Sequence, residues 1–227
     1  PAGMEIMDKA LTKATNDYCK AGYPVDAEAM MIVELDGTES EVNELINRVE
    51  EIAKKNKCSS VKISRSNEER LKFWAGRKAA FPACGDLAPD YMCMDGSIPK
   101  GKLAEVLKAI QKMSEKYQLP VANAFHAGDG NLHPLIMFNA NDPEQMRKTE
   151  EFGSEILKYC VKVGGALTGE HGVGIEKREL MCEAFNDTDI QQQLDIKKAL
   201  DPNSLLNPGK VYPILRKCAK EGRVHVH

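Results

Sequence analysis

Residues 121–139 read VANAFHAGDGNLHPLIMFN, and this stretch decides the fold that the sequence predicts. Two apolar runs flank the dipeptide Asp129–Gly130. Asp-Gly in this setting is a strong signal for a β-hairpin with a two-residue type I′ turn, which requires positive φ at both central residues. Such a turn would place His126 directly opposite His133 on one face of the hairpin.

Alternating and helical apolar patterns extend on both sides of this hairpin. They predict strands at 29–35, at 59–64 and around Asp95. They also predict a helix capped by Thr38 or Ser40, and further helices at 67–80, 103–117 and roughly 143–163. Short helical stretches are expected beyond Gly164. This order of elements is typical of the α+β class, in which an antiparallel or mixed sheet is covered by helices on one face. We therefore expect a ferredoxin-like antiparallel sheet with a small C-terminal helical appendage.

The predicted organisation of the chain has four parts. They are a helical lead-in at 1–24, a ferredoxin-like substrate (cap) domain at 25–164, a Gly-rich segment with a helical appendage at 165–213, and a polar tail at 214–227 that we expect to fray. The Gly-rich segment contains GGALTGEHGVG, and we expect the appendage to return to the functional site.

Composition excludes several classes of partner. The 227 residues carry 31 basic and 34 acidic side chains, well mixed along the sequence, which argues against a surface for nucleic acid or anionic membrane. No apolar run approaches the roughly 20 residues of a transmembrane helix, and the first ten residues do not resemble a secretion signal. These features predict a cytoplasmic protein that would reach the inner face of the membrane only through partner subunits. The chain does not begin with Met, as expected of a piece of a longer protein.

The two histidines of the hairpin are candidates for a metal site. Directly opposed residues have Cβ atoms roughly 4.5–5.5 Å apart, which suits two imidazoles that share one ion at about 2.0–2.1 Å. In the later motif GEHGVG, Glu170 can complete a His2Glu set for Zn, Mn or Fe, and His171 can act as a base beside it. The alternative is that both hairpin histidines are hydrogen-bonded residues at a strand end and that GEHGVG is a Gly-rich turn before a helix.

Several motifs together resemble one family. HAGDGNLHP, LTGEHGVGIEK and DPNSLLNPGKVYP, in this order, are similar to the C-terminal substrate (cap) domain of the FAD-linked oxidases, which are vanillyl-alcohol-oxidase-type flavoproteins. FWAGRKAAFPA and YMCMDGSIPKGKL are similar to the members that act on glycolate or D-lactate. The resemblance extends from about residue 27 to residue 213.

This resemblance implies FAD-dependent oxidation of a D-2-hydroxy acid to a 2-oxo acid, with hydride transfer to flavin N5. The residues it assigns are metal ligands His126, His133 and Glu170, the base His171, the substrate-carboxylate binder Arg77, and the cofactor-contacting residues Asn131 and Lys210. A divalent cation that holds the substrate oxygens would acidify the alcohol for a nearby imidazole.

Two departures from the family pattern limit this transfer. Relatives that use dicarboxylic hydroxy acids have a lysine near the position of Cys93 and an asparagine near Leu135, which favours a small monocarboxylic substrate here. The family's FAD-binding domain precedes the resembling region and is not among these 227 residues. We therefore expect this polypeptide alone neither to retain FAD nor to turn over substrate, and we expect partners that include the FAD-binding domain and other oxidase subunits.

Two other functions remain open at this point. The same His2Glu set would serve a flavin-independent, metal-dependent hydrolase or lyase. A non-enzymatic metal-binding module would also need only these ligands.

Overall fold

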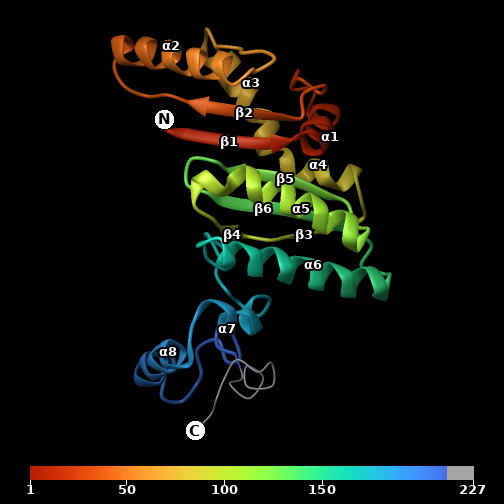
Figure 1. The fold of residues 1–227 in the computed structure, drawn as a ribbon, viewed down its shortest axis with the longest axis vertical. Coiled ribbons are helices and arrows are strands. Elements are labelled where there is room, and N and C mark those ends of the chain that lie inside the picture. The colour runs from red at the N-terminus through yellow and green to blue at the C-terminus, as the bar shows by residue number, and fades with distance from the viewer. Residues whose placement is uncertain (214–227) are drawn as a thin grey trace.

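The structure, a computed structural model, describes residues 1–213 (Figure 1). Its strands are β1 (Gly3–Asp8), β2 (Ala29–Glu34), β3 (Asp90–Cys93), β4 (Gly96–Ser97), β5 (Val121–His126) and β6 (Asn131–Phe138). They form one antiparallel sheet in the order β2-β1-β5-β6-β3, with β4 also paired to β6. The predicted α+β class with an antiparallel sheet is confirmed.

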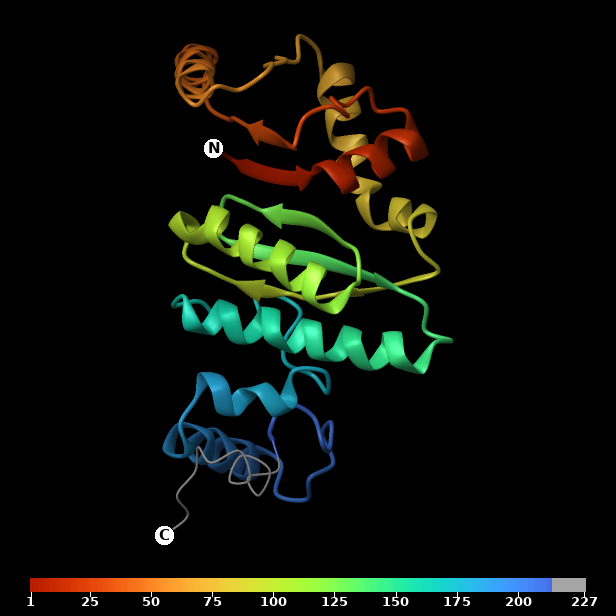
Figure 2. The same cartoon turned by 45° about the vertical axis from the view of Figure 1, so that its right-hand side comes forward.

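Helices lie around this sheet. They are α1 (Lys9–Cys19), α2 (Glu39–Lys55), α3 (Asn67–Lys78), α4 (Ala80–Ala83), α5 (Leu103–Tyr117), α6 (Pro143–Lys162), α7 (Met181–Ala184) and α8 (Asp187–Leu200). The molecule is elongated: β2 and α2 lie near one end, and α7 and α8 lie beyond α6 at the other (Figures 1 and 2).

The two faces of the sheet pack against different helices. Alternate residues of β5 and β6, such as Phe125 and Ile136, join the main core with α5 and α6. The residues between them, such as Ala124 and Leu135, join a second core with α1 and α4. The expectation that helices cover one face only was therefore wrong. Each large side chain that is fully buried in this way contributes about 1.5–3 kcal/mol.

The N-terminal segment also differs from its prediction. Residues 1–24 are only in part the predicted helical lead-in: Lys9–Cys19 is helix α1, but Gly3–Asp8 is strand β1, inside the sheet between β2 and β5. Met7 is buried on the face toward α1, while Glu5 is the cross-strand partner of His126. The period of two that indicates a strand spans only six residues here, too few to stand out beside the helix that follows.

The hairpin between β5 and β6 is real, but its register differs from the predicted one. His126 pairs with Asn131, and His133 pairs with Ala124. The connection is a four-residue loop, 127–130, in which Gly130 N–H donates to the His126 carbonyl at 3.0 Å and has φ of 86°. The type I′ turn is absent because the loop is held by its neighbours: Gly128 N–H donates to the carbonyl of Met4 on β1.

Most of the other predicted elements are confirmed, including the strand at 29–34 and the helices at 39–55, 67–78, 103–117 and 143–162. Thr38 caps α2 through a capping box with Glu41. The predicted strand at 59–64 is wrong, since these residues form no strand and are mostly exposed. An alternating pattern cannot form a strand where no neighbouring strand supplies hydrogen-bond partners.

The segment 165–213 leaves the sheet and folds beyond α6. It begins at Ala166, which bridges to Ser97 of β4, and continues through an irregular loop to α7 and α8. The chain returns to this loop at Val211, whose N–H donates to the Gly174 carbonyl at 2.7 Å. The predicted tail at 214–227 lies outside the described residues.

Candidate functional site

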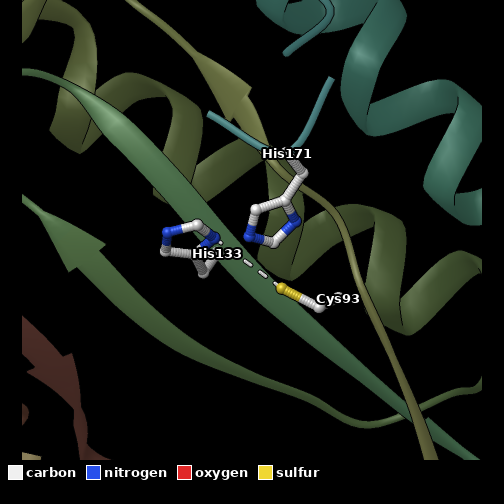
Figure 3. A group of neighbouring side chains, drawn as sticks. All are labelled: Cys93, His133 and His171. Carbon is white, nitrogen blue, oxygen red and sulfur yellow. Dashed lines mark hydrogen bonds between the residues drawn. The ribbon is translucent and has the colours of Figure 1, made fainter. Parts of the chain in front are cut away.

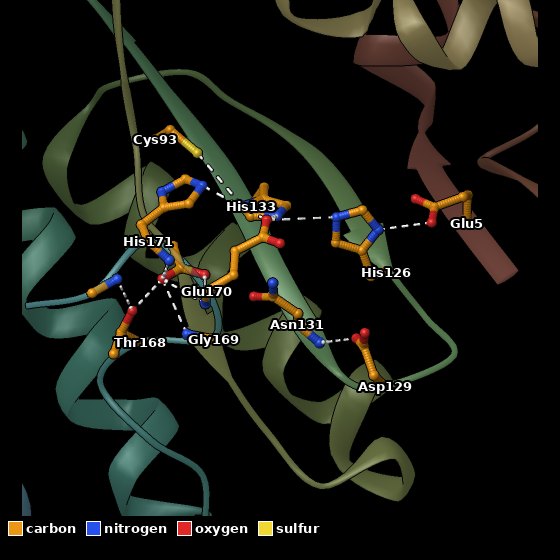
Figure 4. Close-up of polar contacts among 12 residues, drawn as sticks. Glu5, Cys93, His126, Asp129, Asn131, His133, Thr168, Gly169, Glu170 and His171 are labelled. Atoms are coloured by element: carbon orange, nitrogen blue, oxygen red, sulfur yellow. Dashed lines mark hydrogen bonds and ion pairs between the residues drawn. The ribbon is translucent and has the colours of Figure 1, made fainter. Parts of the chain in front are cut away.

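The two hairpin histidines point from the same face of the sheet. They are diagonal neighbours on β5 and β6, because His126 is opposite Asn131 and His133 is two residues further along β6. Their ring centroids are 5.1 Å apart and the rings are nearly perpendicular (Figure 4). His133 is buried, with 2% of its surface exposed, whereas His126 is partly exposed. The predicted proximity therefore holds although the predicted register does not.

Glu170 and His171 reach this histidine pair from the Gly-rich loop that follows α6. Glu170 Oε1 lies 2.9 Å from His133 Nε2 and 3.7 Å from both His126 Nε2 and His171 Nε2. The His171 ring stacks on that of His133 at a centroid distance of 5.1 Å. One carboxylate oxygen thus stands among three imidazole nitrogens, which come from segments far apart in the sequence.

Asp95 holds the loop that carries Glu170 and His171. Its carboxylate is fully buried, and the residue lies between β3 and β4. The donors to this carboxylate are the Thr168 hydroxyl, the backbone N–H groups of Gly169, Glu170 and His171, and the Lys177 ammonium. Successive N–H groups that converge on one anion form a nest, which fixes the loop backbone.

The Asp95–Lys177 ion pair is also buried, with side-chain exposures of 0% and 3% and a separation of 3.0 Å. Burial by itself would raise the pKa of Asp95, but hydrogen bonds from Thr168 and Lys177 and the Lys177 charge hold that pKa well below its usual range. Asp95 is therefore ionised throughout the physiological pH range and is saturated with donors.

The donor atoms at this site suit a metal ion. Among the described residues, two groups have ligand atoms that all lie within 4.8 Å of one another: Cys93, His133 and His171 (Figure 3), and Asp95, His133, Glu170 and His171. His126 is in neither group, yet its Nε2 faces the same Glu170 oxygen. A mixed imidazole and carboxylate set is the donor chemistry of Zn, Mn and Fe sites.

The protonation of His133 favours this use. Burial, together with the neighbouring His126, lowers the pKa of His133, so the ring is neutral at pH 7. A neutral imidazole has one nitrogen with a free lone pair, as a metal ligand requires. The other side of the ring faces Cys93, with 3.7 Å between Nδ1 and Sγ. Burial raises the pKa of the Cys93 thiol to about 12.

Arg77 on α3 is connected to the histidines through Glu5. The guanidinium is about nine-tenths buried, and its Nε and Nη2 lie 3.0 and 2.9 Å from Glu5 Oε2. The other oxygen of Glu5 lies 2.7 Å from His126 Nδ1. Arg77 thus belongs to the same polar network as His126, one residue removed from it.

Asn131 lies beside Glu170 and the histidine pair (Figure 4). The residue is 6% exposed, and its side-chain oxygen has no hydrogen-bond partner among the described residues. A Cβ added to Gly169 would stand 2.2 Å from that oxygen, so only glycine allows the loop to approach the amide. Three other buried side-chain oxygens of the described residues, in Thr15, Asn123 and Thr149, also have no partner, so this feature alone does not identify a ligand site.

Lys210 lies near His171, across an open hollow in the surface. Both residues line an open hollow of about 380 Å³, which Val173 and Lys177 also line. The Lys210 ammonium donates to the Asn207 side chain at 3.1 Å. The structure therefore brings His126, His133, Glu170, His171 and Asn131 together, with Lys210 next to His171 and Arg77 behind Glu5.

Two residues of this network, Glu5 and Asp95, were not predicted. Each is an acidic residue flanked by apolar ones, in MEIM and YMCMDGSIP. Such a residue is costly to bury unless it is paired, which is the signal that could have identified both. Their partners come from distant segments of the chain. The pattern therefore identifies the acidic residue, but it does not predict which groups that residue contacts.

Comparison with known proteins identifies the family of this chain. Residues 1–211 match the family model of FAD linked oxidases, C-terminal domain. The chain is 51% identical over 227 residues to the glycolate oxidase subunit GlcD of Escherichia coli K12, which covers 100% of this chain and 46% of the relative. It is 32% identical over 212 residues to the mitochondrial D-lactate dehydrogenase [cytochrome] of Arabidopsis thaliana, which covers 92% of this chain and 37% of the relative. The chain thus spans less than half the length of these relatives.

A solved structure supports the fold. The structure of p-cresol methylhydroxylase with substrate bound matches with a TM-score of 0.66 at 14% identity, over 94% of this chain and 47% of that chain. Among the helices of residues 1–213, none is long and apolar enough to cross a membrane. Because the family model covers nearly all of the described residues, the chain belongs to the FAD-linked oxidases, as their C-terminal domain.

Proposed function

We propose that this chain is the substrate-binding part of an FAD-dependent oxidoreductase that converts a small D-2-hydroxy acid, glycolate or D-lactate, to its 2-oxo acid. The single observation that carries the proposal is the convergence of three imidazoles on one oxygen of Glu170. Family membership favours this function over a flavin-independent hydrolase or lyase and over a non-enzymatic metal-binding module.

His126, His133 and Glu170 are the proposed ligands of a divalent cation, Zn, Mn or Fe. Their facing atoms lie 2.9 and 3.7 Å from one another without an ion between them. A cation at this position would bind the carboxylate and hydroxyl oxygens of the substrate and lower the pKa of the hydroxyl. The ligands come from one rigid hairpin and from a loop fixed by Asp95, so the site needs little rearrangement.

His171 is the proposed base. It stacks on His133, and its side chain is 46% exposed, which leaves it open toward the hollow that it shares with Lys210. The substrate hydroxyl would give its proton to His171 while the C2 hydride leaves for the flavin, so that the C2–O bond becomes a carbonyl. The products are the 2-oxo acid, a protonated imidazole and a reduced flavin.

Arg77 is the proposed binder of the substrate carboxylate. Its Nε and Nη2 contact Glu5, and Nη1 makes no hydrogen bond to any described residue. A guanidinium can bind one carboxylate with one edge and a second carboxylate with the other. Glu5 would then hold Arg77 in place for the substrate.

The wall beside His133 favours a small, monocarboxylic substrate. Cys93 and Leu135 are directly opposed on β3 and β6, on the face that carries His133. Leu135 is fully buried, and the Cys93 thiol is uncharged because burial raises its pKa to about 12. Neither side chain can pair with a second carboxylate, which disfavours 2-hydroxyglutarate.

Asn131 and Lys210 are the proposed contacts of this chain to the flavin. Asn131 carries a buried amide oxygen with no partner among the described residues, and Lys210 carries an exposed ammonium beside His171. We propose that the flavin itself is held mainly by a separate FAD-binding domain of the longer protein, and that this chain alone does not retain it. Other oxidase subunits are further proposed partners.

Anaerobic bleaching of the flavin in the full-length protein tests this function. D-lactate, glycolate and D-2-hydroxyglutarate are each mixed with the oxidised protein, and flavin absorbance is followed. We expect glycolate or D-lactate to bleach the flavin, and His171→Asn to slow this step by roughly 10²–10⁴-fold. Fast bleaching in the His171→Asn variant would contradict the assignment of the base, and bleaching by D-2-hydroxyglutarate alone would contradict the substrate class.

A further inference from the structure

Glu5 occupies a buried position between two functional side chains. It lies on β1 directly opposite His126 on β5, and its side chain is 11% exposed. Oε1 contacts His126 Nδ1 at 2.7 Å, while Oε2 contacts both Nε and Nη2 of Arg77. Both carboxylate oxygens are therefore used, each toward a different partner.

This arrangement fixes the tautomer of His126. A carboxylate only accepts hydrogen bonds, so the proton of the neutral ring must be on Nδ1. The lone pair then lies on Nε2, the nitrogen that faces Glu170 Oε1 at 3.7 Å. A metal ligand needs its lone pair on that side, and a carboxylate behind the ring also increases the basicity of the ligating nitrogen.

The second histidine has no comparable support. His133 Nδ1 faces the Cys93 sulfur at 3.7 Å, a weak and distant partner. Its Nε2 lies 2.9 Å from Glu170, to which it must donate when no ion is present. His126 is therefore the histidine whose orientation and tautomer are set before an ion arrives.

Arg77 in turn fixes Glu5. Its guanidinium makes two contacts to the single oxygen Oε2 and leaves Oε1 to His126. The backbone of Arg77 is anchored independently, because its N–H donates to the Tyr23 hydroxyl at 2.9 Å. The order of contacts is thus Arg77, Glu5, His126, then the proposed metal position.

We propose that Glu5 is a positioning residue that holds His126 as the Nδ1–H tautomer with Nε2 directed at the metal. This inference rests on the proposed function, in which His126 is a ligand. Glu5 itself touches neither the substrate nor the metal.

The substitution Glu5→Gln tests the inference with little change in shape. Because Arg77 makes two hydrogen bonds to one oxygen, the amide oxygen of the new residue should remain with Arg77, and the NH2 group should turn to His126. A donor at that place requires Nδ1 to accept, which moves the ring proton to Nε2 and removes the lone pair from the metal side. The tautomer of His126 should therefore invert.

Two measurements on the 227-residue chain follow this change. The ¹⁵N shifts of the histidine rings in metal-free protein report the tautomer, and Zn²⁺ titration against a chromophoric chelator reports affinity. We expect His126 to be Nδ1–H in the unmodified chain and Nε2–H in Glu5→Gln, with Zn²⁺ bound roughly 10–100-fold more weakly. The matched control is Glu34→Gln, because Glu34 also pairs with an arginine of α3, Arg70, but contacts no histidine.

Distinct outcomes separate this inference from the proposed function. If His126→Ala weakens Zn²⁺ binding while Glu5→Gln keeps both the Nδ1–H tautomer and full affinity, the role of Glu5 is wrong and the ligand set stands. If His126→Ala leaves Zn²⁺ affinity unchanged, the ligand set is wrong and the inference falls with it. Should Glu5→Gln fail to fold, the double variant Glu5→Met/Arg77→Met removes the acceptor without leaving a buried guanidinium unpaired, and it should show the same loss of affinity.

Discussion

Substitution of Asp95 by Asn should destabilise the protein more than any change to its exposed ion pairs. Asn has the shape of Asp but no charge, so Lys177, whose side chain is 3% exposed, would be left as a buried and uncompensated cation. Removal of one partner of a buried ion pair costs about 3–5 kcal/mol. The amide would also place a donor against one of the loop N–H groups that Asp95 now accepts. We therefore expect the free energy of unfolding to fall by at least about 3 kcal/mol.

Urea unfolding followed by circular dichroism measures this loss, and thermal unfolding should show a midpoint lower by about 6–20 °C, at about 2–4 °C per kcal/mol. The double variant Asp95→Asn/Lys177→Met should recover part of the stability, because it removes the unpaired charge. The control Glu28→Gln breaks an ion pair in which Glu28 is 88% exposed, and it should leave the midpoint unchanged. Should Asp95→Asn unfold at the same urea concentration as the unmodified protein, the assignment of Asp95 as the clamp of the 168–172 loop would be refuted.

Three further predictions concern pH, a glycine and two thiols. The pKa of Asp95 is lowered in the folded state, so below about pH 4 the unfolded state binds more protons than the folded state. The free energy of unfolding should therefore fall as the pH falls, and it should fall less steeply in Asp95→Asn. Urea midpoints measured between pH 5 and pH 2 would show this difference. Gly130→Ala should lower the free energy of unfolding by more than the roughly 1–3 kcal/mol of backbone strain, because φ is 86° and the new Cβ would also lie 2.2 Å from the Ile98 carbonyl oxygen. The control Gly22→Ala, with φ of 75° and no atom within 4 Å of the new Cβ, should lose only the part due to backbone strain. Equal urea midpoints for the two variants would contradict the close approach at Gly130. At pH 8 a thiol reagent should modify the exposed Cys58 quickly and the buried Cys160 only on unfolding, since burial also raises the pKa of Cys160 to about 12. Rapid mass-spectrometric labelling of Cys160 in folded protein would disprove its burial.

Much of the fold could be predicted because its signals are local. The helix at 143–162 begins with Asp142 as its cap and Pro143 in its first turn, and both are visible in the sequence. The hairpin at 121–138 follows from two apolar runs around a Gly-containing turn. Strand β1 was missed because a strand of six residues is stabilised mainly by its neighbours β2 and β5, whose paired residues lie 21 to 121 positions further along the chain.

The candidate site likewise has a part that the sequence could predict and a part that depends on the tertiary structure. The sequence by itself determined the candidate side chains: two histidines around a tight loop, and a glutamate and histidine between glycines. Only the tertiary structure decided how they meet. The hairpin register places His126 opposite Asn131, since the loop is pinned by Met4 and not by an Asp-Gly turn. Two buried carboxylates, Glu5 on β1 and Asp95 between β3 and β4, then orient the histidine and the loop. A buried charge must find its partners wherever the fold brings them, and this requirement has no period or spacing that a sequence pattern could show.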